Sequence, residues 1–113
     1  MIKIYHNPRC GKSREALQIV ESCGQPFEIV KYLDEKLTKK TILDLIKLLK
    51  IKPIQLVRVK EKIWLDNFKH QNLSDIEIIE TMVKFPILIE RPIVINGNQA
   101  VIGRPPVLIK TFL

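Results

Sequence analysis

Residues 2–14 decide the fold of this chain, and their sequence is IKIYHNPRCGKSR. Apolar and polar side chains alternate from Ile2 to Tyr5, which predicts a short β-strand. His6-Asn7-Pro8 ends the alternation, and residues 8–11 are predicted to form a tight loop. A helix is then predicted from about Ser13 to Cys23, because apolar residues recur there at helical spacing. These residues are Ala16, Leu17, Val20 and Cys23.

The residues after this helix complete a recurring structural unit. Gly24 is typical of a helix end, and Phe27 to Val30 read as a second short strand. The opening residues therefore predict a β-loop-α-β unit. Its two strands are expected to lie parallel, joined by a right-handed crossover.

The middle of the chain is predicted to be helical. Thr38 is expected to cap a helix that runs to about Lys50. Pro53 fits the first turn of another helix, to about Arg58, and residues 64–70 read as a loop or a short helix. The first of these helices has a stripe of apolar residues that is expected to be buried. The stripe consists of Ile42, Leu45, Ile46 and Leu49.

One more helix closes this middle region. Ser74 and Glu77 match a capping box, and the helix that they open is predicted to run to about Lys84, before Pro86 stops it. The residues expected to point inward are Ile76, Ile79, Met82 and Val83.

The last third of the chain predicts a β-hairpin and a terminal helix. Ile93 to Ile95 and Ala100 to Ile102 read as strands, and Asn96-Gly97 is a turn pair favoured in tight hairpins, in a loop that Asn98 can lengthen. Pro105-Pro106 then starts a short helix. The order βαβ, helices, β-hairpin and α predicts an α/β fold of the thioredoxin or glutaredoxin type. It has a mixed sheet and a helical insertion between its two halves. We predict one domain over residues 1–113, because no linker, repeat or low-complexity segment divides the chain.

Composition narrows the classes of function. The net charge is +7, but the lysines are scattered, and no arginine-rich tract or aromatic platform accompanies them. This pattern disfavours a nucleic-acid partner. The chain has no apolar run of about eighteen residues, and its start reads as a strand rather than as a signal peptide. We therefore expect a cytoplasmic protein with no membrane partner, and a monomer.

Cys10 is the candidate nucleophile, because it stands where a strand ends and a helix begins. The thiolate, not the thiol, is the reactive form of cysteine, and the N-terminus of a helix favours an anion. His6, Arg9, Lys12 and Arg14 are expected to add positive charge nearby. Such surroundings lower the pKa of a cysteine from about 8.5 to between about 4 and 7. A buried structural cysteine is the alternative, but the basic loop argues against it.

Two neighbours of Cys10 are expected to serve an oxyanion. Gly11 has no side chain, so backbone N–H groups can approach a bound oxyanion closely. Ser13 can donate a hydrogen bond to the thiolate. Cys10 and Ser13 have the spacing of a redox C-x-x-C motif, but serine replaces the second cysteine. An oxidised Cys10 must therefore be resolved by another thiol.

Cys23 is not expected to supply that second thiol. It lies at the far end of the first predicted helix, and a rise of about 1.5 Å per residue keeps the two sulfurs apart. Filling of the core is the interpretation that we favour for it. The chain has only two histidines and no cluster of thiols or carboxylates near them, so we expect no metal site and no bound cofactor.

Three arginines are candidates for oxyanion binding: Arg58, Arg91 and Arg104. Arg91 and Arg104 each precede a proline, which favours extended backbone and so fixes the direction of the side chain. Arginine suits planar, bidentate recognition of oxyanions. In a thioredoxin-like layout the proline before the hairpin faces the cysteine loop, which predicts that Arg91 lies near Cys10. A surface cation paired with a carboxylate such as Glu90 is the alternative for each arginine.

The residues described so far resemble a known family. Residues 5–14, YHNPRCGKSR, resemble the active-site segment of the glutaredoxin-coupled arsenate reductases. Residues 86–94, PILIERPIV, and Gly103-Arg104-Pro105 are similar to the second and third signatures of that family. The resemblance covers nearly the whole chain.

The resemblance implies a role for each matched residue. Cys10 is similar to the nucleophile, His6 and Ser13 to residues that tune the thiolate, and Pro92 to the cis-proline of the fold. Arg58, Arg91 and Arg104 look like the oxyanion-binding trio, beside Gly11. The implied reaction is the reduction of arsenate to arsenite: Cys10 attacks the arsenic, glutathione adds as co-substrate, and glutaredoxin removes the oxidised product.

Two other functions remain open on the sequence. The same residues would serve a thiol-disulfide or deglutathionylating reductase that acts on another substrate. The chain also resembles the Spx regulators, which share this fold and bind RNA polymerase without catalysis. Those regulators commonly carry C-x-x-C as a redox switch, and Ser13 interrupts that motif here. Fold alone does not decide among these functions, so the chemistry of the site carries the argument.

Overall fold

The computed structural model describes residues 1–113. The chain forms two compact units. Residues 1–35 and 91–113 form the first unit, and residues 36–90 form the second. The helical insertion expected from the sequence is this second unit. The single domain predicted for residues 1–113 stays a prediction.

The first unit is built on a mixed four-stranded sheet. The strands β1 (Ile2–Tyr5) and β2 (Phe27–Val30) have the predicted bounds, and β3 (Ile93–Asn96) and β4 (Gln99–Ile102) form the hairpin. The strand order is β2-β1-β3-β4. β1 pairs in parallel with β2 and antiparallel with β3, as the predicted crossover and hairpin require.

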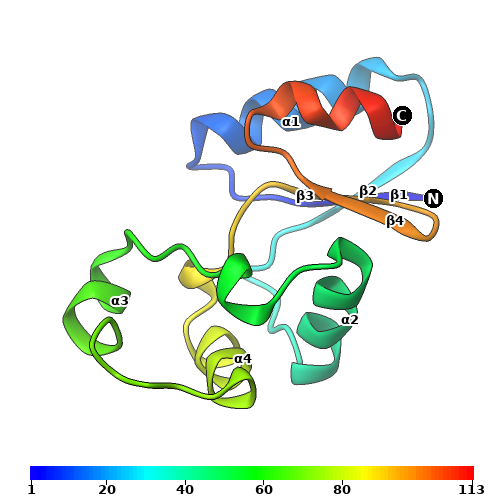
Figure 1. Cartoon of the computed structure of the whole chain (residues 1–113). Coiled ribbons are helices and arrows are strands. Elements are labelled where there is room, and N and C mark those ends of the chain that lie inside the picture. Colours follow the sequence, from blue (N-terminus) through cyan, green and yellow to red (C-terminus); the bar gives the residue numbers. More distant parts are fainter. The chain divides into compact units, whose positions relative to one another are not determined.

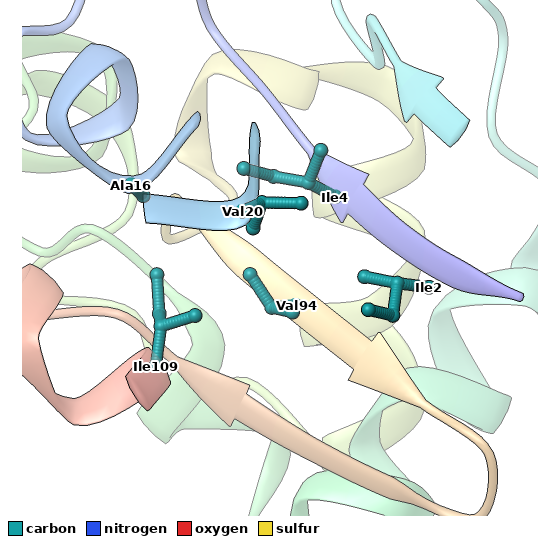
Figure 2. Close-up of a cluster of buried hydrophobic side chains, with 6 residues drawn as sticks. All are labelled: Ile2, Ile4, Ala16, Val20, Val94 and Ile109. Atoms are coloured by element: carbon teal, nitrogen blue, oxygen red, sulfur yellow. The ribbon is translucent and has the colours of Figure 1, made fainter. Parts of the chain in front are cut away.

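Two helices pack together on one face of this sheet (Figure 1): α1 (Gly11–Ser22) and the 3-10 helix η3 (Pro106–Phe112). Ile2 and Ile4 alternate along β1 and so share a face, while Ala16 and Val20 are one helical turn apart on α1. Figure 2 shows these four side chains meeting Val94 and Ile109 in one buried cluster. This cluster fixes α1, and therefore the residue that caps it, relative to the sheet.

The hairpin turn lies one residue later than the sequence predicted. Asn96 pairs with Gln99, so the turn is Gly97-Asn98, and Gly97 has a φ of 65° that glycine adopts without strain. The same register pairs Ile93 with Ile102. Continued by two positions, it sets Arg91 opposite Arg104.

The second unit is helical throughout, and α2, η1 and η2 each contact α4. The predicted caps are confirmed. The Thr38 hydroxyl accepts from the Thr41 N–H over 3.1 Å, and Ser74 and Glu77 form a complete capping box. The elements are α2 (Lys39–Leu49), η1 (Pro53–Leu56), α3 (Lys62–Asn67), α4 (Asp75–Lys84) and η2 (Pro86–Leu88).

Two predictions for this unit were wrong in detail. The helix expected over residues 53–58 is a single 3-10 turn, because Val57 adopts extended backbone and forms a β-bridge with Ile89. On α4, Ile76 is 57% exposed, whereas Ile78 is buried in its place. Ile78 and Met82 are four residues apart and both buried, so the buried face of α4 is rotated toward them.

The segment read as a loop or a short helix contains α3, which begins slightly before the predicted start. No helix of the chain combines the length and the apolar character that crossing a bilayer requires.

Candidate active site

The site begins with the loop between β1 and α1, which is folded around Asn7. The Asn7 carbonyl accepts from the Cys10 N–H over 3.0 Å, and its side-chain Oδ1 accepts from the Arg9 N–H, also over 3.0 Å. Asn7 is only 4% exposed. Asn7 was not predicted to be a site residue, although asparagine before proline is a known turn signal. These bonds fix where Cys10 leaves the loop and enters the helix.

Cys10 is the N-cap residue of α1, and its side chain is half-buried. Its thiol makes no conventional capping hydrogen bond. Burial acts to raise the pKa of the thiol, but the backbone N–H groups of Ser13 and Lys12 and the charged, hydrogen-bonding Arg91 outweigh it. The net result is a Cys10 pKa below its ordinary value. This is the behaviour expected of a reactive cysteine at a helix N-terminus.

Two of the three predicted arginines meet at this sulfur. The Arg104 Nη2 atom donates to Cys10 Sγ over 3.5 Å, and its Nε atom donates to the Arg91 carbonyl over 2.7 Å. Arg91 is 6% exposed and is the arginine that lowers the Cys10 pKa. The hairpin register explains this pair, because it sets the two residues side by side at the open end of β3 and β4.

Both arginines precede cis peptide bonds. The Arg91–Pro92 bond is cis, as the family resemblance implies, and the Arg104–Pro105 bond is cis as well, which the sequence did not indicate. The Gly103 N–H donates to the Pro92 carbonyl over 2.9 Å, so the two segments stay joined beyond the last strand pair.

His6 and Ser13 lie together beneath the loop. The His6 Nδ1 atom is 2.7 Å from the Ser13 Oγ atom, which also accepts from the Asn7 N–H over 2.9 Å. Burial is the main reason that the His6 pKa lies below its ordinary value, and the cations Lys31 and Arg14 lower it further, against the hydrogen bond with Ser13. At neutral pH the imidazole is therefore uncharged. The positive charge that the sequence analysis expected from His6 is not present.

The Ser13 hydroxyl was expected to donate a hydrogen bond to the thiolate, but it has other partners. It bonds to His6 and Asn7, and the Ser13 backbone N–H, rather than its hydroxyl, favours the thiolate. Ser13 is completely buried, so it links the imidazole to the loop backbone.

The remaining basic residues of the loop are exposed. The Arg14 Nη1 atom donates to the Pro8 carbonyl over 2.9 Å and so braces the loop. Lys12 and Arg9 are also exposed. A Cβ atom added to Gly11 would meet only the Arg14 side chain, at an ordinary 3.7 Å. The protein itself therefore has room for a larger residue at this position, and a role for Gly11 in oxyanion binding stays a prediction.

Arg58, the third predicted arginine, belongs to the second unit. Its Nε atom donates to Glu61 Oε1 over 3.1 Å, and its Nη1 atom donates to Glu90 Oε1 over 3.3 Å. The ion pair with Glu90 is the alternative that the sequence left open. A role for Arg58 in oxyanion binding stays a prediction.

Cys23 is the C-cap residue of the same helix that Cys10 begins. Thirteen residues separate the two cysteines, which corresponds to about 20 Å along a helix. A disulfide requires Cα atoms within about 7 Å, so these two cannot pair while α1 is folded. Histidine, cysteine and carboxylate side chains form no group of three or more that could hold a metal ion.

The chain is similar to one known protein family over almost its full length. The ArsC family model matches residues 5–112, which span both units. The chain belongs to the ArsC family. The predicted family resemblance is thus confirmed.

Relatives in the ArsC family carry informative names. An arsenate reductase of Haemophilus influenzae is 40% identical over 105 residues, which cover 91% of this chain and 90% of that protein. The uncharacterized protein YfgD of Escherichia coli is 43% identical over 107 residues, covering 93% and 90%. Several relatives of this chain, that of Haemophilus influenzae among them, are named arsenate reductases, which supports the assignment of an oxidoreductase.

A solved structure supports the fold. An arsenate reductase from Vibrio cholerae superimposes with a TM-score of 0.93 at 36% identity, and the match covers 99% of this chain and 97% of that one. The predicted α/β fold of the thioredoxin type is confirmed.

Proposed function

We propose that this chain reduces arsenate to arsenite, with Cys10 as the nucleophile and with glutathione and glutaredoxin as the source of electrons. The observation that carries the proposal is the Cys10 sulfur itself. It caps a helix, its pKa is lowered, and an arginine donor lies 3.5 Å away. A thiolate beside guanidinium groups can attack an oxyanion whose charge those groups neutralise.

The first step is attack of the Cys10 thiolate on the arsenic. A sulfur–arsenic bond forms, and one oxygen leaves as water after protonation. The guanidinium groups of Arg91 and Arg104 bind the remaining oxygens and neutralise their negative charge. We propose the same role for Arg58, because it matches the family motif. The backbone N–H groups at the start of α1 are available to the oxyanion on the side left open by Gly11.

The following steps need two thiols from outside, because Ser13 replaces the second cysteine and Cys23 is about 20 Å away along the helix. The glutathione sulfur bonds to the arsenic and displaces a second oxygen as water. A glutaredoxin thiolate then attacks the glutathione sulfur, and the electron pair of the broken arsenic–sulfur bond stays on arsenic. Hydrolysis releases arsenite and Cys10. One arsenate and two thiols thus give one arsenite, one disulfide and one water.

The direct test is arsenite release by the purified chain with arsenate, glutathione and glutaredoxin. We expect turnover that depends on both thiols and is absent in Cys10→Ser. Absence of arsenite above that control would reject the proposal. Turnover of a glutathione mixed disulfide without arsenite release would assign the same thiolate to deglutathionylation instead.

A further inference from the structure

A groove of about 730 Å³ lies between α1 and η3 in the first unit. Lys12 and Ile19 line it from α1, and Pro105 and Val107 line it from the segment that leads into η3. The two helices run in the same direction (Figure 1), and the Gln25 side chain donates to the Leu113 carbonyl at their far end. The groove therefore has one end near Cys10 and one end near Cys23.

The near end of the groove is lined by residues that are close in sequence to those at the reactive sulfur. Lys12 lies two residues after Cys10, and its backbone N–H favours the Cys10 thiolate. Pro105 directly follows Arg104, whose guanidinium donates to Cys10 Sγ. A molecule held at Lys12 and Pro105 thus occupies the end of the groove that the chain connects directly to Cys10 and Arg104.

The charges of the groove describe its occupant. Lys12 and Lys110 supply two cations and Glu15 supplies one anion, beside apolar lining residues that include Ile19 and Val107. Glutathione has the complementary set, since it carries two carboxylates and one ammonium group. A strongly anionic occupant would be repelled by Glu15, and a strongly cationic occupant would be repelled by Lys12 and Lys110.

The size of the groove agrees with a small peptide. Its volume lies within the range of about 300 to 1,000 Å³ that is usual for small-molecule sites. From Lys12 to Cys23 the α1 wall extends about 16 Å, and an extended tripeptide spans about 10 Å. A tripeptide therefore fits within the groove and reaches its Cys10 end.

We infer that the groove between α1 and η3 is the binding site for the thiol co-substrate, glutathione. This inference rests on the proposed function, because it assigns a place to the thiol which that reaction consumes. Lys110 and Lys12 bind the carboxylates and Glu15 binds the ammonium group. The cysteine of the tripeptide lies at the Lys12 end, within reach of the arsenic on Cys10.

The first experiment measures binding without catalysis. Reduced glutathione is titrated into ¹⁵N-labelled Cys10→Ser protein, and backbone amide shifts are followed by NMR. We expect saturable shifts confined to residues 12–23 and 105–110. Shifts elsewhere only, or none at millimolar glutathione, would overturn the inference. If the shifts of the groove amides depend on protein concentration, the groove binds a second copy of this chain. If glutaredoxin alone causes the shifts, the groove binds glutaredoxin. Either result would also overturn the inference that the groove binds glutathione.

The second experiment measures catalysis in a matched pair of variants. Lys110→Glu reverses a charge in the groove, and Lys40→Glu reverses the charge of a lysine on α2 whose side chain is 88% exposed. We expect Lys110→Glu to raise the KM for glutathione on the order of fivefold and to leave the KM for arsenate unchanged. Equal effects of the two variants would contradict the inference. Groove shifts by NMR without any arsenite release would reject the proposed function and retain the groove.

Discussion

The two cysteines of this chain cap opposite ends of one helix, and the two ends give them different chemistry. Cys10 begins α1, where free backbone N–H groups and Arg91 favour a negative charge. Cys23 ends α1, where free carbonyl groups point outward, and it packs against the apolar cluster around Ile2 and Val20. The same side chain is thus a candidate nucleophile at one end and a packing residue at the other.

This contrast teaches that position on the helix decides the role of each cysteine. Neither sulfur is fully buried, and both belong to the same compact unit. What differs is the set of groups directed at the sulfur. Substitution of these groups one at a time tests whether each has the effect that the structure assigns to it.

The largest expected effect on arsenite release comes from replacing the cysteines themselves. Cys10→Ser removes the attacking sulfur and should lower arsenite release by at least about a thousandfold, as loss of a nucleophile does. Cys23→Ala should stay within about twofold, since Cys23 lies at the end of α1, and of the groove, that is opposite the attacking sulfur. Steady-state arsenite assays measure both. Comparable losses would show that the two helix ends do not differ as described.

A second variant removes the guanidinium group of Arg104, which donates hydrogen bonds both to the Cys10 sulfur and to the Arg91 carbonyl. Arg104→Lys keeps the charge but cannot make both bonds, so kcat/KM for arsenate should fall by about ten- to a hundredfold. Arg14→Lys is the matched control. Arg14 is exposed and donates only to the Pro8 carbonyl among the bonds described, so the loss should stay below about threefold. Similar losses in both variants would assign the effect to loop disruption.

A third prediction compares two serines on α1. Ser13→Ala leaves the buried Asn7 N–H without its hydroxyl partner, which should lower the free energy of unfolding by about 1–3 kcal/mol. Ser22→Ala, near the other end, removes an exposed bond to the Gln18 carbonyl and should change it by less than about 0.5 kcal/mol. Urea denaturation measures both values. A neutral Ser13→Ala would contradict the buried network under the loop.

The smallest expected effect is a pH dependence carried by His6. Its pKa lies below the ordinary value because of burial first, so the folded state binds a proton less readily than the unfolded state. Above pH of about 6.5 both states are neutral and His6 contributes no slope. Below it the unfolded state gains the proton first, so the free energy of unfolding falls as the pH falls, down to the folded pKa. His6→Asn should show a shallower fall below about pH 6.5, measured by urea denaturation. An equally steep fall would mean that His6 is not protected in the folded state.

The sequence predicted the elements whose signals are local. β1 and β2 have the predicted bounds, and Thr38 and Ser74 cap the helices that they were expected to cap. Each of these signals is contained in a few neighbouring residues. The sequence also predicted that Arg91 lies near Cys10, because the fold class places the proline loop opposite the cysteine loop.

The details that sequence analysis missed depend on tertiary contacts. The helix after Pro53 is short because Val57 pairs with a residue 32 positions later, Ile89. Ile76 was expected inside because it stands at helical spacing from Ile79 and Val83, whereas the buried face of α4 includes Ile78 instead. The neutrality of His6 follows from its burial and from Lys31, which no local pattern reveals. Arg58 stays a prediction, because its described partners are Glu61 and Glu90 within its own unit.

One measurement tests the central claim most directly: titration of the Cys10 thiol by its thiolate absorbance near 240 nm. The Cys23→Ala protein isolates the Cys10 signal, and the Cys10→Ala protein reports Cys23 alone. The structure predicts that the apparent pKa of Cys10 lies below the ordinary value of a cysteine thiol and that it rises in Arg91→Lys. A Cys10 pKa at or above that ordinary value, unchanged by the substitution, would contradict the account.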